Sequence, residues 1–501
     1  MTERSVIVIG GGMAGLASGI YARASGYDVT VFEMYSGPGG VCTAWEREGY
    51  VLDGCLHWLV GGEEGTAFRP LWDEVGAVDL DLVAHDTMSV VRDLHGNELV
   101  FWSDSSRLES SMRAQWPDEE AGISELVKGS RTMAKAGFEV PNVPPDMMGL
   151  VDTLKMLAKS GLGMVKMRKY QMMPIAELSE LFEDTFLRRA IGNVMIQQQV
   201  SAMTVMATLA WIDGGDASWV HGGSRTLVRK LEKRLLDLGG TIEYRSKVDR
   251  VLVQGDRAVG VQLSDGTDHR ADYIISAADG HATIFDMLEG RYADDRIREL
   301  YDKMETFTPL IQVSLGIDRD LSDEPWSVVL LLDAGTQIAG ANVDAVWMHH
   351  YSYDSSMAPP GKSCVTTVLA ADLTHWEDLS RQGREAYAAA KEDVARQVAE
   401  LVERSYPGIS DRIEVVDVAT PTTYIRHTGN WKASYQGWLM SPENTRISNM
   451  SLPRKLPGLR GLVMAGQWVT VGGGLPSVVL TGRWAVQTMC AEMGTTFSAP
   501  S

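Results

Sequence analysis

Alternating apolar runs and helical patterns mark the start of the chain. Residues Ser5 to Ile9 form an apolar run that predicts a buried strand, and the pattern from Met13 onward predicts a helix. A second apolar run, Asp28 to Phe32, predicts another strand. A strand, a helix and a strand in this order are typical of a parallel βαβ unit, so we expect an α/β fold at this end of the chain.

The same pattern returns between residues 221 and 285. Leu227, Leu231, Leu235 and Leu238 recur with the spacing of one helical face, and Gly239 ends the predicted helix. Four runs after it predict strands, the middle two forming a hairpin: 241–244, 247–253, 258–263 and 273–277. A last apolar run, 462–465, leads through a glycine-rich turn into a C-terminal helix.

Two long segments separate these regular blocks. Residues 66–220 show helical segments and loops, and residues 286–455 are of mixed character. Within the second segment, 385–403 predict an amphipathic helix and 420–438 predict an aromatic, basic loop. We therefore expect a Rossmann-type domain assembled from three separated parts and an inserted mixed α+β substrate domain made of the two long segments. The expected boundaries are 1–65, 66–220, 221–285, 286–455 and 456–501.

Methionines and lysines are concentrated between residues 147 and 173. Seven of the 25 methionines of the chain lie there: Met147, Met148, Met156, Met164, Met167, Met172 and Met173. Methionine is common on adaptable apolar surfaces, and a basic, apolar helix can lie among lipid headgroups. The segment is therefore either a core helix with a solvated lysine face or an element that faces a membrane or the substrate entrance.

Net charge and cysteine content argue against some partners and bound groups. A net charge of −20 disfavours nucleic acid as a partner, because no basic surface is available to neutralise phosphates. Cys42, Cys55, Cys364 and Cys490 are far apart in sequence, which fits neither a disulfide framework nor a zinc site, and we expect no bound metal. With no signal peptide and no apolar run of about 18 to 20 residues, we expect a cytoplasmic protein with at most peripheral membrane contact.

The glycines after the first strand have the spacing of a dinucleotide-binding site. Gly10, Gly12 and Gly15 form a G-x-G-x-x-G motif, in which the first glycine permits the turn, the second lets a pyrophosphate approach and the third lets the helix pack on the strand. The first helical residues, Met13 and Ala14, supply free N–H groups. Glu33 ends the second strand, about 20 residues further on, where a carboxylate can bind ribose hydroxyls. The spacing alone is weak evidence, and the strand, helix and acidic residue around it carry the prediction.

The next segment resembles a known family. GPGGVCTAWEREGYVLDGCLHWLVG, beginning at Gly37, is similar to the second conserved block of FAD-dependent oxidoreductases of the phytoene desaturase type, within the amine oxidase-type flavoprotein superfamily. The order of Asp53, Gly54 and His57 most resembles the carotenoid isomerase and retinol saturase branch. Val41 stands where many of these proteins carry arginine, so a phosphate contact is either missing or made by the backbone.

The resemblance implies an FAD cofactor and further contacts to it. It implies contacts from the glycine loop, a valine at the adenine end and a turn over the flavin: Gly39, Gly40, Val41, Val248, Gly466, Gly474, Leu475 and Pro476. It also implies hydride transfer by the flavin on an extended, apolar polyene or isoprenoid lipid, whether by desaturation, saturation or double-bond isomerisation. The expected partner is therefore a hydrophobic small molecule, and the oligomeric state stays open.

Catalytic roles are less defined. His57 is the first candidate for proton transfer, with a structural histidine as the alternative. Asp53 is better explained as a turn or cofactor-loop residue than as an acid. Arg426, His427 and Lys432 either bind a polar substrate end or hold their loop.

Two other functions stay under consideration. An amine oxidase-like flavoenzyme would oxidise a C–N bond and typically places two aromatic rings against the flavin, for which only Trp468 is suitably placed. A flavoprotein that carries a lipid without catalysis is the second. A reductase with its own NAD(P)H domain is disfavoured, because the chain has one G-x-G-x-x-G motif rather than two.

Overall fold

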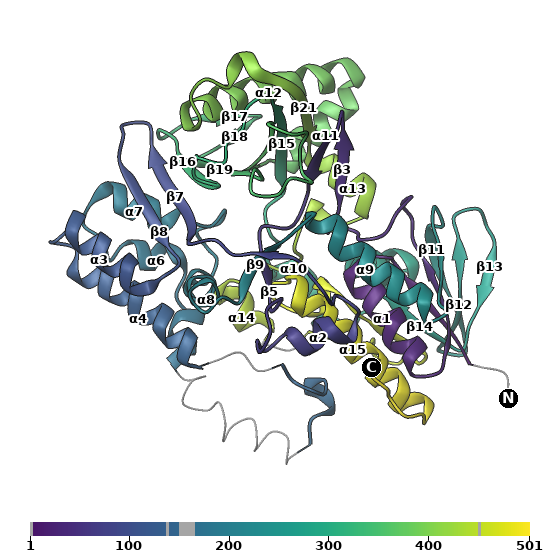
Figure 1. Ribbon diagram of the computed structural model, residues 1–501. Coiled ribbons are helices and arrows are strands. Elements are labelled where there is room, and N and C mark those ends of the chain that lie inside the picture. The colour runs from purple at the N-terminus through teal and green to yellow at the C-terminus, as the bar shows by residue number, and fades with distance from the viewer. Residues whose placement is uncertain (1–3, 137–139, 150–165, 449–451, 501) are drawn as a thin grey trace.

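A parallel sheet forms the centre of the computed structural model, which describes residues 4–136, 140–149, 166–448 and 452–500 (Figure 1). Its strand order is β10-β2-β1-β14-β22, and every neighbouring pair is parallel. The strands are β1 (Ser5–Ile9), β2 (Asp28–Phe32), β10 (Thr241–Glu243), β14 (Tyr273–Ser276) and β22 (Leu462–Met464). The α/β fold class and these five predicted strands are confirmed.

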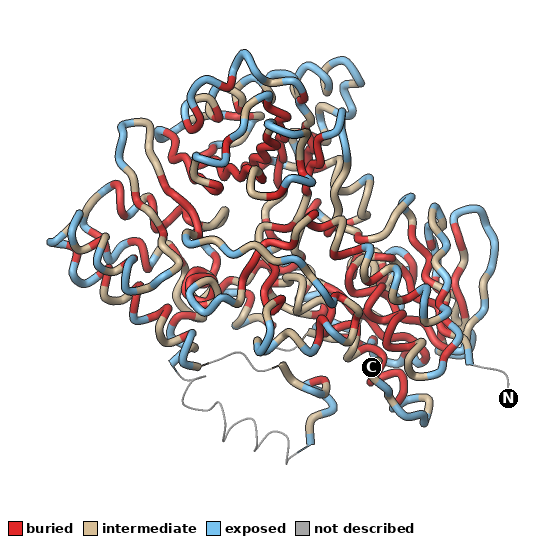
Figure 2. The backbone as a smooth tube through the Cα atoms, in the orientation of Figure 1, coloured by how far each residue is buried: buried red, intermediate tan, exposed pale blue. Residues whose placement is uncertain are grey.

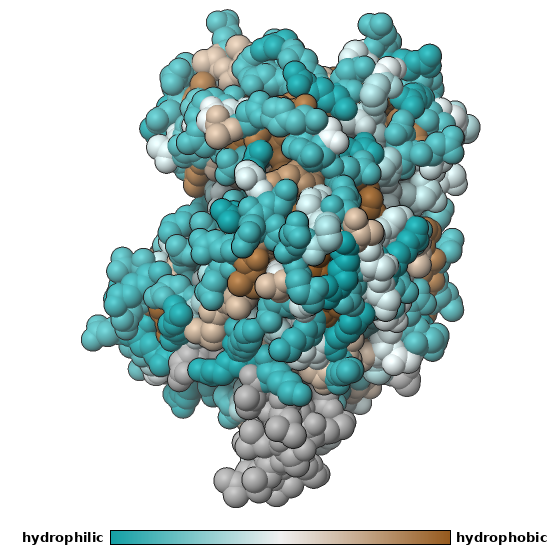
Figure 3. Space-filling view, turned by 90° about the vertical axis from the view of Figure 1, so that its left-hand side faces the viewer, coloured by the Kyte–Doolittle hydropathy of each residue, from teal (hydrophilic) through white to brown (hydrophobic). Residues whose placement is uncertain are grey.

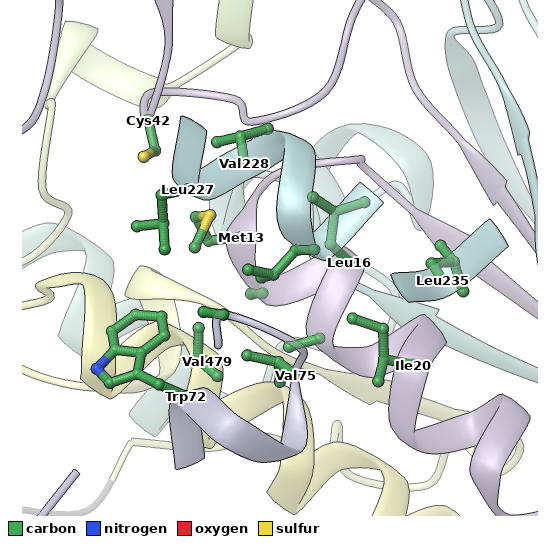
Figure 4. Close-up of a cluster of buried hydrophobic side chains, with 14 of the residues drawn as sticks. Met13, Leu16, Ile20, Cys42, Trp72, Val75, Leu227, Val228, Leu235 and Val479 are labelled. Atoms are coloured by element: carbon green, nitrogen blue, oxygen red, sulfur yellow. The ribbon is translucent and has the colours of Figure 1, made fainter. Parts of the chain in front are cut away.

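Three helices pack together beside this sheet (Figure 4): α1 (Met13–Ala24), α9 (Gly223–Asp237) and α15 (Leu475–Met493). Leu16 and Ile20 of α1 meet Leu235 of α9 and Val479 of α15 in one buried cluster. The leucine spacing of α9 therefore marks its buried face, as predicted. A separate apolar cluster joins the parallel sheet to the antiparallel strands β11 (Val248–Gln254) and β12 (Arg257–Leu263), and β13 (Asp268–Arg270) pairs with β12.

A seven-stranded sheet lies apart from the parallel sheet, in the upper part of Figure 1. Its order is β21 (Ile413–Ala419), β15 (Leu310–Ile317), β20 (Ser363–Ala370), β19 (Ala345–His350), β16 (Ser327–Leu331), β7 (Thr87–Asp93) and β8 (Glu98–Trp102). Most residues of these strands are buried (Figure 2). The sheet combines strands from both long segments, so these segments form one domain rather than two separate ones.

Smaller strands and helices complete the molecule. The remaining strands are β3 (Ala44–Arg47), β4 (Tyr50–Asp53), β5 (Leu59–Val60), β6 (Leu82–Val83), β9 (Ala217–Val220), β17 (Gln337–Ile338) and β18 (Ala341–Asn342). The remaining α-helices are α2 (Arg69–Glu74), α3 (Ser105–Gln115), α4 (Glu120–Ala136), α6 (Ile175–Ser179), α7 (Thr185–Gly192), α8 (Ala202–Asp213), α10 (Asp295–Lys303), α11 (Leu373–Gln382), α12 (Arg384–Ser405), α13 (Pro421–Thr428) and α14 (Pro442–Ser448).

Two sequence predictions were wrong. Residues from about 66 to 215 were expected to form helical segments and loops, yet β7 and β8 also lie there, because β7 pairs in parallel with β16, more than 200 residues away in sequence. Residues 420–438 were expected to be a loop, yet they begin with α13. Thr420 and Thr423 form a capping box at its start, and Gly429 ends it at a left-handed φ of 69°.

The surface and the methionine-rich segment bear on membrane contact. Among the residues that the structure describes, no helix is both long and apolar enough to cross a membrane. The face in Figure 3 is mostly hydrophilic with apolar residues scattered over it. Of the methionine-rich segment 147–173, residues 150–165 lie outside the described residues, so its membrane role stays a prediction.

Candidate functional site

A large cavity lies where the parallel sheet meets the seven-stranded sheet. Its volume is about 1130 Å³, and its wall includes residues of all three parts of the predicted nucleotide-binding region. Typical small-molecule sites occupy roughly 300 to 1,000 Å³, so this cavity is large enough for more than one drug-sized group.

The first glycine motif forms one end of the cavity. Gly10 has a φ of +95°, which makes the turn after β1. A Cβ at Gly15 would lie 1.8 Å from the Gly10 carbonyl oxygen, so only glycine lets α1 pack this closely. Gly12, on the cavity wall, is the N-cap of α1, and no described side chain caps this helix end. The free N–H groups of the first turn are therefore available to an anion.

A second glycine loop closes over the first. The Gly39 N–H donates to the Gly11 carbonyl over 2.9 Å, and Gly12 and Gly39 form a parallel bridge. Gly39 itself has a φ of +114°. Both Gly39 and Gly40 line the cavity, with Val41 beside them. The two loops together make a backbone cradle without side chains that would exclude a phosphate.

Glu33 is buried at the edge of this cradle. Its carboxylate accepts from the Gly11 N–H at 2.6 Å and from the Tyr35 N–H at 2.7 Å. Burial raises the pKa of Glu33, and these backbone donors oppose the rise. Each oxygen keeps a lone pair that can accept from a ribose hydroxyl.

A second helix end points at the same cavity. Gly474 is the N-cap of α15, again without a cap from a described side chain, and Leu475 and Pro476 follow it on the cavity wall. Trp468 also lines the wall, and its buried indole N–H has no partner among the residues that the structure describes. Two uncapped helix ends and an unpaired donor around one space fit a dinucleotide cofactor with a polar ring system.

The structure brings nearly all the predicted site residues to one cavity. Those on its wall are Gly10, Gly12, Met13, Ala14, Glu33, Gly39, Gly40, Val41, His57, Val248, Gly466, Gly474, Leu475 and Pro476. Gly15 lies off the wall, where it serves helix packing. Arg426 and His427 also line the cavity, whereas Lys432 lies over the Trp431 ring, 4.2 Å from its centroid.

Asp53 has a structural place. Its carboxylate accepts four hydrogen bonds, from the Cys55 and Leu56 N–H groups at 2.9 Å and from the Ser224 N–H and hydroxyl at 2.7 Å. These bonds join the turn before His57 to the first turn of α9. Because these four bonds occupy the carboxylate oxygens, Asp53 fits the predicted role of a turn residue better than the role of a catalytic acid.

His57 lies half-buried on the cavity wall, next to the buried His349. Its ring centroid is 4.3 Å from that of His349 on β19, and the His57 Nδ1 atom has no partner within the described part of the chain. Burial lowers the pKa of His57 to about 4, and those of His85 and His350 to about 4. His57 is therefore neutral at pH 7, and its burial opposes protonation.

The buried histidines make stability depend on pH. The pKa of His349 lies well below its usual range because of burial, so protons bind to the unfolded chain below about pH 6.5 but not to the folded site. This contribution is complete above pH 6.5 and is lost as the pH falls. We expect wild type to lose about 2 kcal/mol more than His349→Phe between pH 7 and pH 5. Urea denaturation at both pH values measures this difference, and equal losses would contradict it.

Asp279 was missed in the sequence. It follows β14, as Glu33 follows β2, and it lines the cavity. Its carboxylate accepts from the Ala282 N–H at 2.8 Å and from the Trp431 N–H at 2.9 Å. Burial raises the pKa of Asp279 to about 7. Glu33 was identified as an acidic residue at the end of a parallel strand, and Asp279, three residues after the end of β14, carries a similar signal.

One group of lining residues carries no charge. The lining residues from 195 to 211, from 307 to 368 and from 435 to 440 include no Asp, Glu, Lys, Arg or His. Helix α8 and strand β20 contribute apolar side chains, among them Met203, Ala207, Trp211 and Val368. The five acidic residues of the described wall lie elsewhere on it: Glu33, Asp53, Asp249, Asp279 and Asp286.

Comparisons with known proteins agree with this geometry. The family model described as flavin containing amine oxidoreductase matches residues 13–490. The chain is 23% identical to prolycopene isomerase of Daucus carota, covering 99% of this chain and 82% of that protein. It is 22% identical to the lycopene-forming phytoene desaturase of Pseudescherichia vulneris, covering 98% and 100%. The solved structure of cyclohexylamine oxidase from Brevibacterium oxydans matches with a TM-score of 0.60 at 15% identity, over 98% of this chain and all of that one, and shows the fold alone.

Proposed function

The chain belongs to the flavin containing amine oxidoreductase family, and from this premise we propose that it is an FAD-dependent oxidoreductase of an extended, apolar polyene or isoprenoid lipid. The observation that carries the proposal is the large cavity, which has an anion-binding cradle and an uncharged stretch of wall. Bound FAD supplies hydride transfer at its flavin ring.

The glycine loops would hold the cofactor. We assign the pyrophosphate of FAD to the free N–H groups at the start of α1 and the flavin to the turn before α15. The partial positive charge at the start of α15 stabilises negative charge on a nearby ring. Val248 and Glu33 would contact the adenosine part, and the Trp468 N–H would donate to a ligand acceptor.

The uncharged wall supports a hydrocarbon substrate rather than an amine. A protonated amine pays heavily for burial unless a carboxylate pairs with it. No carboxylate lines the cavity between residues 195 and 211 or between 307 and 368, whereas apolar and methionine side chains do. Methionine adapts well to long, irregular ligands. The names of the relatives, prolycopene isomerase and phytoene desaturase, agree with this substrate class.

Chain residues have three further roles in this proposal. The uncharged wall aligns the substrate and excludes water from the reacting carbon. Neutral His57, with its unpaired Nδ1, is the proposed proton-transfer group, and because its pKa is low it would hold a substrate proton only transiently. We also propose a cytoplasmic location, which is supported by four cysteines that are all free thiols.

We expect a polyene, and not an amine, to change the flavin spectrum. Phytoene and prolycopene in detergent, with cyclohexylamine as the matched amine, would be added without oxygen to the purified protein in its oxidised and its reduced state. Bleaching of the oxidised flavin by phytoene, or isomerisation of prolycopene by the reduced protein, supports the proposal. Reduction by cyclohexylamine would instead favour an amine oxidase. Binding of the polyene with neither spectral change nor product would favour a lipid carrier.

A further inference from the structure

Two cysteines, one before and one after the β3–β4 hairpin, line the same cavity. In the β3–β4 hairpin Ala44 pairs with Asp53, and the Gly54 N–H donates to the Thr43 carbonyl over 2.9 Å. One more step along this register places Cys42 opposite Cys55. The Cys42 thiol is hydrogen-bonded to the Cys55 sulfur, and both residues line the cavity. Opposing positions of a hairpin lie close to the separation that a disulfide requires.

The two thiols differ in environment. Cys42 is 3% exposed and belongs to the buried cluster that includes Leu227 and Val228 of α9 (Figure 4). Its bond to Cys55 and its burial raise its pKa, so it stays protonated. Cys55 is half-buried and reaches the cavity. A buried protonated thiol beside a more accessible sulfur is the arrangement of a resolving cysteine and an attacking cysteine.

The backbone holds both cysteines in place. The Cys42 N–H donates to the Gly39 carbonyl over 3.1 Å, and the Cys55 N–H donates to Asp53 over 2.9 Å. Cys42 therefore belongs to the glycine loop of the cradle, and Cys55 belongs to the turn that carries His57. A covalent link between the two would join these loops.

We propose that Cys42 and Cys55 are a redox-active dithiol that a hydroperoxide converts to a disulfide in the cavity wall. The Cys55 thiolate attacks the outer peroxide oxygen, which breaks the O–O bond, forms a sulfenic acid at Cys55 and releases water or an alcohol. The Cys42 sulfur then attacks the sulfenic sulfur while its thiol proton passes to the departing hydroxyl, which forms the S–S bond and releases that hydroxyl as water. The two sulfurs together lose two electrons, which reduce the peroxide, and a dithiol reductant reverses the step.

The test follows the thiols directly, so it does not depend on substrate turnover. Purified full-length protein with its bound cofactor is treated with hydrogen peroxide, alkylated after denaturation and mapped by peptide mass spectrometry. We expect a Cys42–Cys55 cross-linked peptide, alkylated Cys364 and Cys490, and return of the two thiols after dithiothreitol. Four alkylated cysteines, or a sulfinic acid at Cys55 without the cross-link, would overturn the proposal.

Variants assign the two roles. In Cys42→Ser the sulfenic acid at Cys55 has no resolving thiol, so a sulfenic-specific probe should label Cys55. In Cys55→Ser, Cys42 should stay reduced. Cys490→Ser is the matched control, since Cys490 is buried in α15, and it should form the cross-link as wild type does. The cross-link in the wild-type protein tests the proposal without any variant, so a variant that fails to fold does not prevent the test. Flavin content is measured separately for each protein.

Discussion

Replacing Gly12 with aspartate is expected to give a folded protein that no longer retains flavin. Gly12 has the extended backbone of an N-cap, at φ −71° and ψ 178°, which suits aspartate. A Cβ there meets its nearest neighbour, the Gly39 carbonyl oxygen, at 3.7 Å, an ordinary contact. The new carboxylate would cap α1 and take the N–H groups that the pyrophosphate needs. It would also repel that group, so we expect flavin affinity to fall by about a hundredfold or more.

The measurement is flavin content after purification, followed by titration of the apoprotein with FAD. Gly37→Asp is the matched control, because Gly37 lies in the neighbouring loop, off the cavity wall, where an added Cβ would meet no described atom within 4 Å. It adds the same charge and should keep the flavin. Thermal denaturation should show Gly12→Asp to be as stable as the wild-type apoprotein. Full flavin content in Gly12→Asp would show that the cofactor does not use this helix end.

Removing the Asp53 carboxylate is expected to destabilise the protein strongly. Asp53→Ala leaves the buried N–H groups of Cys55, Leu56 and Ser224 and the Ser224 hydroxyl without their acceptor. Unsatisfied buried donors cost about 1 to 3 kcal/mol each before relaxation, so we expect a loss of roughly 3 to 5 kcal/mol in the free energy of unfolding.

Urea denaturation of the two proteins measures that loss. Asp265→Ala, a change at an exposed turn of the β12–β13 hairpin, is the control and should cost little. Asp53→Asn keeps the shape but can accept at only one oxygen, so it should fall between wild type and Asp53→Ala. A change of less than about 1 kcal/mol in Asp53→Ala would contradict the structural role.

Local chemistry explains why the parallel sheet and the cradle were predictable. Gly10 makes the turn after β1, Gly12 leaves room for a phosphate, and Gly15 lets α1 pack closely on β1. All three reasons lie within a few residues of sequence. Strands β1 and β2 read as buried runs because both faces of the parallel sheet are covered. Patterns of this kind depend on neighbours in the sequence, and the sequence therefore contains them.

What was missed depends on distant partners. Strand β7 is a strand because it pairs with β16, and nothing near residue 87 in the sequence indicates that partner. Helix α13 had a local signal in its capping box and in Gly429, but its aromatic and basic residues suggested a loop. The cysteines seemed unrelated until the β3–β4 pairing, which ends at Ala44 and Asp53, showed that Cys42 and Cys55 flank the same end of the hairpin. A ring contact likewise joins His57 to a distant residue of β19.

The most direct test of the account is the visible absorption spectrum of the purified protein, with the released cofactor identified after denaturation. The account predicts the two absorption bands of oxidised flavin and free FAD in the supernatant. A colourless protein that also fails to bind added FAD would contradict it, because the cradle from Gly10 to Glu33 and the turn before α15 would then hold some other ligand.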